Sequence, residues 1–233
     1  CRLQAYAVKY VESAKSLGID VAAGVRRSTR ILRKRLKSFR ARLPCFRRLK
    51  SAKKCLRRVL RTGAATGMTY GEVYGVADAM LHEQRRAVVQ AAAPLTGAGG
   101  ANIDLALTLI DGPHGAVDPA YAAHQTPIVQ WARAIYSAWI PTDILGPSCT
   151  AAIRKVKDAS SPWAVVRGPA GALVASALRI GWDVLDATRI VTADGTTLDL
   201  TTESPAAVKV AVAEAVVSWR WSRVAVSYTH LRA

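Results

Sequence analysis

The chain has 233 residues, of which 51% are hydrophobic and 21% are charged, and its formal net charge is +17 at pH 7. This hydrophobic content excludes a wholly disordered protein, and the length allows one large domain or two small ones with a real core. The four cysteines are too few and too scattered for a disulfide scaffold, and they form no Cys-x-x-Cys pair for a zinc ribbon, which favours a reducing compartment. No apolar run reaches about 18 residues, so we expect no membrane span.

Apolar spacing at the start of the chain predicts a helix followed by a strand. Residues 2–16 carry apolar side chains at helical intervals and predict the end of a helix. Residues 16–21 then predict a short strand-like piece that ends at Gly24. We treat residues 1–25 as one N-terminal segment.

The positive charge is concentrated in the next segment. Between Arg26 and Arg61 there are 17 Lys and Arg residues, and no Asp or Glu occurs between Asp20 and Glu72. The rest of the chain holds 16 basic and 16 acidic residues, so its charges balance. The sequence therefore predicts a basic module joined to an ordinary globular body.

The basic segment, residues 26–63, predicts two helices. Ser28 or Thr29 can cap the first helix, which Pro44 interrupts, and Gly63 is expected to end the second. Each helix has a narrow apolar stripe with Lys and Arg on its other faces. We expect the two stripes to pack against each other and to leave a cationic outer surface.

The remainder of the chain predicts further helices. Residues 64–96 contain a helix that follows a Tyr-Gly step, and a Gly-rich loop at 97–100 separates them from residues 101–225. The expected fold is mainly α, with a basic two-helix module followed by a helical connector that contains one small β-hairpin. The expected elements are helices at 78–92, 102–110, 118–140, 148–159, 168–181 and 204–223, and a hairpin at 188–201 around Asp194-Gly195.

The last eight residues, 226–233, match a string of laboratory DNA. GTC TCT TAT ACA CAT CTC CGA GCC encodes Val-Ser-Tyr-Thr-His-Leu-Arg-Ala, and this string resembles the mosaic-end adapter of transposase-based sequencing libraries. We therefore interpret residues 226–233 as translated adapter and expect the natural protein to continue differently after Ala225.

Catalytic and metal-binding patterns are weak in this sequence. His82, His114 and His124 show no His-Glu-x-x-His spacing, and the last two are expected in a turn and at an exposed helix start, so we predict no metal site. Asp104 and Asp111 look isolated, whereas two-metal chemistry needs paired carboxylates. All six tryptophans lie in the neutral half among aliphatic residues, where we expect them to form core.

The cationic helix pair is the strongest functional signal. Lys and Arg on a helix face bind nucleic-acid phosphates without base preference. A solvated charged surface is the plain alternative, but mixed charges serve solubility better than 17 cations without an acid. An anionic membrane surface would need bulky apolar anchors, and only Phe39 and Phe46 are present in the pair. The sequence therefore favours a nucleic-acid partner.

The order of these segments resembles a known family. Leu17-Gly18-Ile19, the basic helix pair, and Tyr70-Gly71 followed by Glu72 are similar to the region after the polymerase palm in non-LTR retrotransposon reverse transcriptases. In that family a Leu-Gly-Val/Ile strand belongs to the primer grip, and the thumb helices follow it. The downstream half resembles the connector of reverse-transcriptase-like reading frames in protist retroelements, which leads to a ribonuclease H domain. The connector segments that match are 131–133, Trp163, 166–169, 178–182 and 188–201.

The resemblance implies a non-catalytic piece of an RNA-directed DNA polymerase. The Tyr/Phe-x-Asp-Asp metal-binding turn does not occur in this sequence, so Mg²⁺ would belong to an upstream palm and this chain would hold no cofactor. Residues 29–60 would lie along the template–primer duplex, Leu17, Gly18 and Ile19 would place the primer end, and 101–225 would form a helical spacer. The candidate phosphate contacts are Arg30, Arg33, Lys34, Lys37, Arg40, Arg47, Lys50, Lys53, Lys54 and Arg57.

The implied partners are an RNA or DNA template–primer, the upstream palm and a downstream ribonuclease H domain, without a membrane. We expect an intracellular ribonucleoprotein, nuclear or cytoplasmic. Two other functions stay open: a stand-alone basic RNA- or DNA-binding protein, and an interaction scaffold with a basic targeting segment. A nearby start codon without a palm would favour the former, and partner binding that survives deletion of 26–61 would favour the latter.

Overall fold

The computed structural model describes residues 13–16, 19–22, 27–51, 56–92, 102–111 and 117–229. The N-terminal elements are β1 (Ser13–Ser16), β2 (Ile19–Ala22), α1 (Arg30–Ala41), α2 (Leu43–Ser51), α3 (Leu56–Val59), the π-helix η2 (Leu60–Ala64), α4 (Ala65–Thr69) and the 3-10 helix η3 (Glu72–Tyr74). The later elements are α5 (Asp78–Ala92), α6 (Ile103–Asp111), α7 (Pro119–Tyr136), α8 (Thr142–Lys157), α9 (Pro162–Val165), α10 (Pro169–Arg179), β3 (Asp183–Val184), β4 (Arg189–Val191), β5 (Thr197–Asp199) and α11 (Pro205–Thr229).

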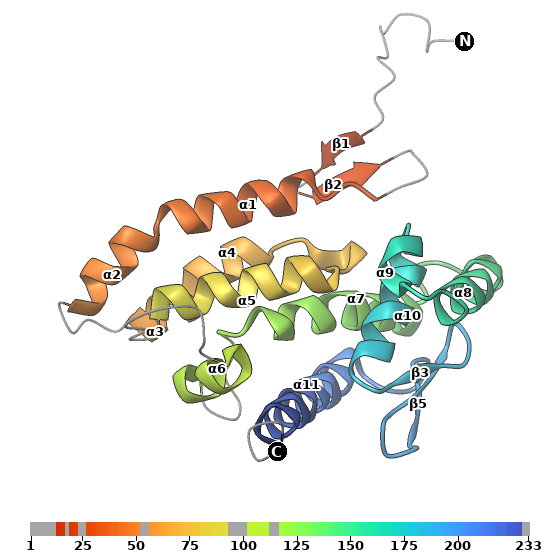
Figure 1. Ribbon diagram of the computed structural model, residues 1–233. Coiled ribbons are helices and arrows are strands. Elements are labelled where there is room, and N and C mark those ends of the chain that lie inside the picture. The colour runs from red at the N-terminus through yellow and green to blue at the C-terminus, as the bar shows by residue number, and fades with distance from the viewer. Residues whose placement is uncertain are drawn as a thin grey trace, which may run out of the picture.

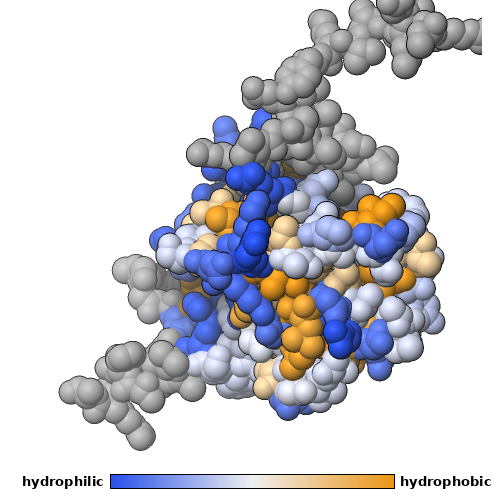
Figure 2. All heavy atoms as spheres, turned by 90° about the vertical axis from the view of Figure 1, so that its right-hand side faces the viewer, coloured by the Kyte–Doolittle hydropathy of each residue, from blue (hydrophilic) through white to orange (hydrophobic). Residues whose placement is uncertain are grey.

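The described chain is mainly helical with a small three-stranded antiparallel sheet, which confirms the expected fold class. Figure 1 shows α1 and α2 along one side of the molecule, α7 through the middle and α11 on the opposite side. The hairpin β4–β5 forms where it was expected, and β3 extends it to three strands. No helix in the described ranges is both long and apolar enough to cross a membrane. On the face at the right of Figure 1, hydrophilic and hydrophobic residues lie next to each other (Figure 2).

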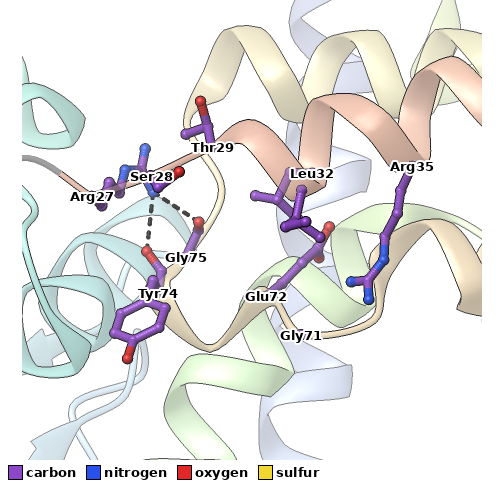
Figure 3. Close-up of a pocket in the computed structure, with 10 residues that line it drawn as sticks. Arg27, Ser28, Thr29, Leu32, Arg35, Gly71, Glu72, Tyr74 and Gly75 are labelled. Atoms are coloured by element: carbon purple, nitrogen blue, oxygen red, sulfur yellow. Dashed lines mark hydrogen bonds between the residues drawn. The ribbon is translucent and has the colours of Figure 1, made fainter. Parts of the chain in front are cut away.

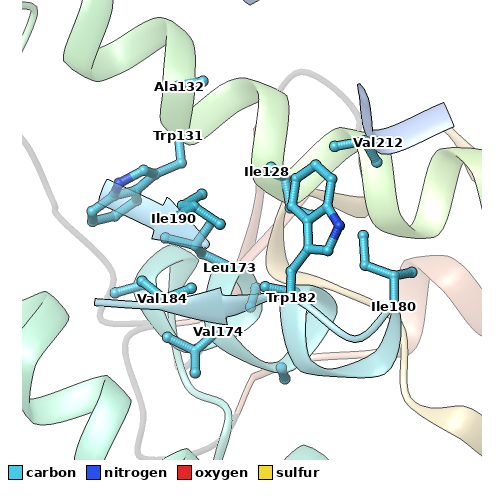
Figure 4. Packing of buried hydrophobic residues seen from close by; sticks show 14 of the residues in the cluster. Ile128, Trp131, Ala132, Leu173, Val174, Ile180, Trp182, Val184, Ile190 and Val212 are labelled. Carbon is cyan, nitrogen blue, oxygen red and sulfur yellow. The ribbon is translucent and has the colours of Figure 1, made fainter. Parts of the chain in front are cut away.

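The larger apolar core, which we call the body core, lies where α7 meets α10, α11 and the three-stranded sheet. Ile128 and Trp131 of α7 pack there with Trp182 and with Ile190 of β4 (Figure 4). The indole N–H of Trp131 donates a hydrogen bond to the carbonyl of Ala187 at 2.8 Å. Burying a large apolar side chain stabilises a fold by about 1.5–3 kcal/mol, so the short strands are held by the core rather than by their few ladder bonds.

A second apolar core joins the basic helices to α4 and α5. Leu36 and Phe39 of α1 and Phe46 of α2 are buried together with Met68 of α4 and Val88 of α5. The expectation that the apolar stripes of the two basic helices pack mainly on each other is therefore wrong. α1 and α2 follow one another along the same side (Figure 1), so both stripes face the helices beneath them.

The N-terminal expectation needs one correction. Residues 13–16 form the strand β1 instead of the end of a helix, and they pair antiparallel with Ile19–Ala22, with Ser16 opposite Ile19. The strand expected around Ile19 is confirmed, and it supplies the hydrogen-bonding partner that favours an extended chain at 13–16. Residues 2–12 lie outside the described part of the chain.

Gly63 does not end the second basic helix, contrary to expectation. The chain continues helically through the π-helix Leu60–Ala64 and α4 to Thr69. Ala65 and Met68 are buried by this continuation. Their burial outweighs the helix-weakening effect of one glycine, which is about 1 kcal/mol.

Several boundaries of the later helices also differ from expectation. α7 ends at Tyr136 because Ala138 adopts a positive φ of 49°, and α8 begins directly after Pro141. The early end of α7 leaves Trp139 78% exposed, and Trp221 on α11 is 48% exposed, so these two tryptophans are not core. α11 runs to Thr229 and includes residues 226–229, whose interpretation as translated adapter stays a prediction.

Gly75, between η3 and α5, is required by both conformation and space. Its φ is 71°, in the left-handed region that favours glycine. A Cβ at this position would lie 2.6 Å from ring carbon Cζ3 of Trp163 and 3.2 Å from the Cβ of Ala172. The turn before α5 can therefore approach α9 and α10 only without a side chain.

We expect Gly75→Ala to lower the free energy of unfolding by about 2 kcal/mol or more, because it adds backbone strain and a clash with Trp163. Gly67→Ala in α4 is the matched control, since a Cβ there meets nothing within 4 Å. We expect the control to be neutral or stabilising by up to about 1 kcal/mol. Urea unfolding measures both changes, and equal effects would contradict the role given to Gly75.

Candidate nucleic-acid interface

The outer side of α1 carries a row of exposed cations. Arg33, Lys34 and Lys37 are exposed, whereas Leu36 and Phe39 on the other side of the helix are buried. Within the described chain, no ion pair or hydrogen bond occupies these three cationic side chains. An α-helix advances about 5.4 Å per turn, so successive turns present a cation each. The buried stripe fixes the helix on α4 and α5 and thereby fixes the direction of the cations.

Other sequence-predicted cations lie near this row. Arg30 is exposed at the start of α1 on the same side, and Arg47 is exposed on α2. Arg40 is exposed as well, but its guanidinium forms an ion pair with Glu83 of α5. We call the four α1 cations the basic face: Arg30, Arg33, Lys34 and Lys37.

Arg57 is directed toward the body instead of toward solvent alone. Its Nη2 donates a hydrogen bond to the carbonyl of Asp111 at 2.6 Å and lies 3.9 Å from the carboxylate of the same residue. The side chain therefore connects α3 to the end of α6, which leaves it less suited to a phosphate contact than the basic face.

Most of the remaining predicted residues lie wholly or partly outside the described part of the chain. The side chain of Lys50 and all of Lys53 and Lys54 lie outside it, as do Leu17 and Gly18. Ile19 is the first residue of β2. Its placement at a primer end stays a prediction.

Two arginines of the basic segment hold α1 to the η3 turn. Arg27 donates hydrogen bonds from Nη1 to the carbonyls of Tyr74 at 3.0 Å and Gly75 at 2.7 Å (Figure 3). Arg35 donates to the carbonyl of Tyr70 and lies 5.0 Å over its ring. These residues line a small pocket beneath the first turn of α1. They stabilise the fold, so the basic segment is divided between structural and exposed cations.

Glu72 closes this pocket from below α1 (Figure 3). Its side chain is 1% exposed, Oε1 accepts a hydrogen bond from Gln84 Nε2 at 2.7 Å, and Oε2 has no partner within the described chain. Burial raises the pKa of Glu72 to about 8, although the Gln84 hydrogen bond and the charges of Arg179 and Arg35 oppose the shift. The carboxyl is therefore largely protonated at neutral pH and does not offset the basic face.

The raised pKa makes stability depend on pH. The folded protein keeps the Glu72 proton up to about pH 8, whereas the unfolded chain loses it near the usual 4.5. The folded state is therefore penalised increasingly as pH rises from about 5 to about 8. Glu72→Gln removes this penalty: its stability relative to wild type should rise by a few kcal/mol over that window. Urea unfolding from pH 4 to 9 measures this.

The matched control is Glu214→Gln, which makes the same substitution at an exposed site of α11. A flat difference between Glu72→Gln and wild type across the same range would show that Glu72 is ionised in the folded state.

Asp104 and Asp111 are not isolated, contrary to the sequence-based expectation. Arg85, only 4% exposed, forms ion pairs with Asp104 at 2.7 Å and with Asp118 at 3.0 Å. Oδ2 of Asp111 accepts hydrogen bonds from the backbone N–H groups of Val117 and Asp118. The carboxylates thus belong to a structural network of arginines and backbone amides, and their sequence spacing gave no sign of the partners.

The histidines also differ from expectation. His124 is fully buried inside α7 rather than exposed, with its ring 5.4 Å from that of Trp219. Burial lowers the pKa of His124 to about 3, with a further contribution from the charge of Arg179, so the ring is neutral. His82 is exposed on α5, and His114 lies outside the described residues. Among those residues, no three His, Cys, Asp or Glu side chains are arranged to hold a metal ion.

Comparisons with known proteins add no family to this picture. No protein-family model matches the sequence, no curated protein matches it, and no solved structure matches its fold. The similarity to reverse transcriptases therefore rests on the short segments quoted above, and the assignment of function is a proposal.

Proposed function

We propose that the basic face of α1 binds the phosphate backbone of a nucleic-acid duplex. The observation that carries the proposal is that Arg33, Lys34 and Lys37 stay exposed and unpaired by described residues on a helix whose other side is buried. Their neighbours Arg35 and Arg40 are engaged by the protein itself. Fixed cations bind phosphates with less loss of conformational freedom than a mobile tail, and they read no sequence.

The apolar side of the pair supports nucleic acid over an anionic membrane surface. Insertion of a helix between lipid headgroups needs exposed aromatic or aliphatic anchors. Phe39 and Phe46 are 4% and 5% exposed, and their rings contact each other at 5.2 Å between centroids. The anchors that a membrane would require are thus used inside the protein.

On the resemblance given above, we further propose that the chain is the thumb and connector region of a retroelement RNA-directed DNA polymerase. A thumb that grips a duplex has to stay in register with the rest of the enzyme. Arg40 with Glu83, and Arg57 with Asp111, tie the basic helices to the neutral body, which is consistent with such a grip. Catalysis would be supplied by a separate palm with its own Mg²⁺.

The duplex contact is tested by Arg33→Gln, Lys34→Gln and Lys37→Gln combined in one variant. With four phosphate contacts, log K of duplex binding falls against log salt with a slope of about −4. The triple variant should flatten the slope by roughly 3 and weaken binding at low salt by about tenfold or more. Fluorescence anisotropy with an RNA–DNA duplex across a salt series measures both quantities.

The matched control is Arg133→Gln, Lys155→Gln and Lys209→Gln, which removes the same side-chain types from exposed positions of the body. Both variants lose three charges, so a purely non-specific attraction would weaken them equally. Equal affinities and slopes for the two variants would remove the basic face as the binding site.

The polymerase proposal has its own test in the nucleotides that flank this reading frame. We expect an in-frame Tyr/Phe-x-Asp-Asp turn upstream of Cys1, within about one domain length of typically 100–150 residues. Sequencing the locus from genomic DNA decides this. A start codon at that place without a palm would leave a stand-alone nucleic-acid-binding protein, and the duplex-binding test would still apply.

A further inference from the structure

A groove with a cationic and aromatic lining lies on the body, away from the basic face. It has a volume of about 450 Å³ and is formed by α5, α10 and α11, which all pack against α7 (Figure 1). We call it the Arg–Trp groove. The residues that line it are Asp78, Ala79, Leu81, His82, Arg85, Arg179, Trp219 and Arg223.

One wall of the groove is a tryptophan with two guanidinium groups close to its ring. Arg85 and Arg223 each lie 5.1 Å from the ring centroid of Trp219. Arg85 is fixed by its carboxylate partners, and Arg223, with a half-exposed side chain, donates from Nε to Asp104 at 3.2 Å. The wall thus consists of an indole ring and guanidinium planes. Nucleic-acid bases stack on both kinds of surface.

Arg179 supplies a second, unusual cation. Its side chain is 8% exposed and lies 4.2 Å over the ring of Trp163, and Nη2 is 2.9 Å from a carboxylate oxygen of Asp78. Nε and Nη1 are buried and have no hydrogen-bond partner within the described chain. Burial of a guanidinium with unsatisfied donors is costly. Its one carboxylate partner, Asp78, is 74% exposed and can be displaced by a competing anion.

The charges of the lining favour an anionic ligand. Arg85 and Arg223 are paired with Asp104 and Asp118, so the charge open to a ligand is that of Arg179, whose carboxylate partner Asp78 is exposed. Leu81 and Ala79 add apolar surface, which a bare oxyanion would not use. The volume is that of a small-molecule site. These features together fit a ligand with one flat aromatic ring and one phosphate.

We propose that the Arg–Trp groove binds a nucleoside monophosphate, either free or as one unit of a single strand, with its base on the Trp219–Arg223 wall and its phosphate between Arg179 and His82. The proposal goes beyond duplex binding by the basic face and does not depend on it.

Calorimetric titration of the full chain with adenosine 5′-monophosphate tests the proposal, with adenosine and inorganic phosphate as separate probes. We expect sub-millimolar affinity for the monophosphate and affinities weaker by about tenfold or more for each half of it. A phosphate affinity equal to that of the monophosphate would overturn the proposal, because it would leave the aromatic wall without a role. Absence of monophosphate binding would overturn it too.

Variants locate the site. Arg223→Gln should weaken monophosphate binding by about tenfold, because a neutral amide replaces the guanidinium. His82→Gln should weaken it by several-fold, because the amide does not reproduce the geometry of the imidazole N–H. Asp78→Asn should strengthen binding by several-fold, because it releases Arg179 for the phosphate. An increase in affinity cannot come from partial unfolding, so this variant keeps the test decisive even where Arg223→Gln reduces stability. Unchanged affinity in Asp78→Asn and His82→Gln would place the ligand elsewhere.

Two further measurements separate the ligand sources and the two surfaces. The first compares a single-stranded hexanucleotide with the free monophosphate. If the hexanucleotide binds more tightly and loses that advantage in Arg223→Gln, the ligand is a strand. Equal affinities identify a free nucleotide, and both results support the groove. The triple variant Arg33→Gln, Lys34→Gln and Lys37→Gln should leave monophosphate affinity unchanged. Loss of monophosphate binding in that variant would assign it to the basic face and contradict the proposal.

Discussion

The buried ion pair between Arg85 and Asp118 is the interaction on which the rest of the structure depends. Both side chains are almost completely buried, and two hydrogen bonds of 3.0 Å join the guanidinium to the two carboxylate oxygens. Asp118 also accepts the backbone N–H of Ala120 at 2.9 Å and so caps α7. One carboxylate therefore fixes the start of the central helix and its position on α5. Breaking a buried pair on one side typically costs about 3–5 kcal/mol, because the other charge is left uncompensated.

The Arg85–Asp118 pair belongs to a network of ion pairs that also holds the C-terminal helix α11. Asp104 of α6 binds Arg85 and Arg223, and Arg220 of α11 lies 3.8 Å from Asp118. Helices that start more than a hundred residues apart are joined through these few charges. α5 consequently has two roles: its apolar side supports the basic helices, and its charged side forms the floor of the Arg–Trp groove. The helix that carries the basic face packs on α5, and α5 also lines the groove.

Local sequence signals predicted most of the fold and little of this network. The helices at 78–92, 103–111 and 169–179 were predictable because caps, periodicity and Pro or Gly boundaries lie within a few residues of each other. Asn102, for example, caps α6 by accepting the N–H groups of Asp104 and Leu105. Asp104 itself looked isolated because its partners, Arg85 and Arg223, are distant in sequence. His124 looked exposed because its position near a helix start says nothing about Trp219, which covers it in the fold.

The candidate interface was predictable as a segment but not residue by residue. The segment from Arg26 to Arg61 has 17 cationic residues and no Asp or Glu. The carboxylates that pair with some of these cations therefore come from the rest of the chain. Glu83 binds Arg40, and Asp111 binds Arg57, because those cations face the body. On α1, Arg33, Lys34 and Lys37 are left unpaired by the described residues, and they lie on the side of the helix that faces away from the body. Charge that the fold neither pairs nor buries carries a repulsion that an external polyanion relieves, and this is the physical reason to regard α1 as a binding surface.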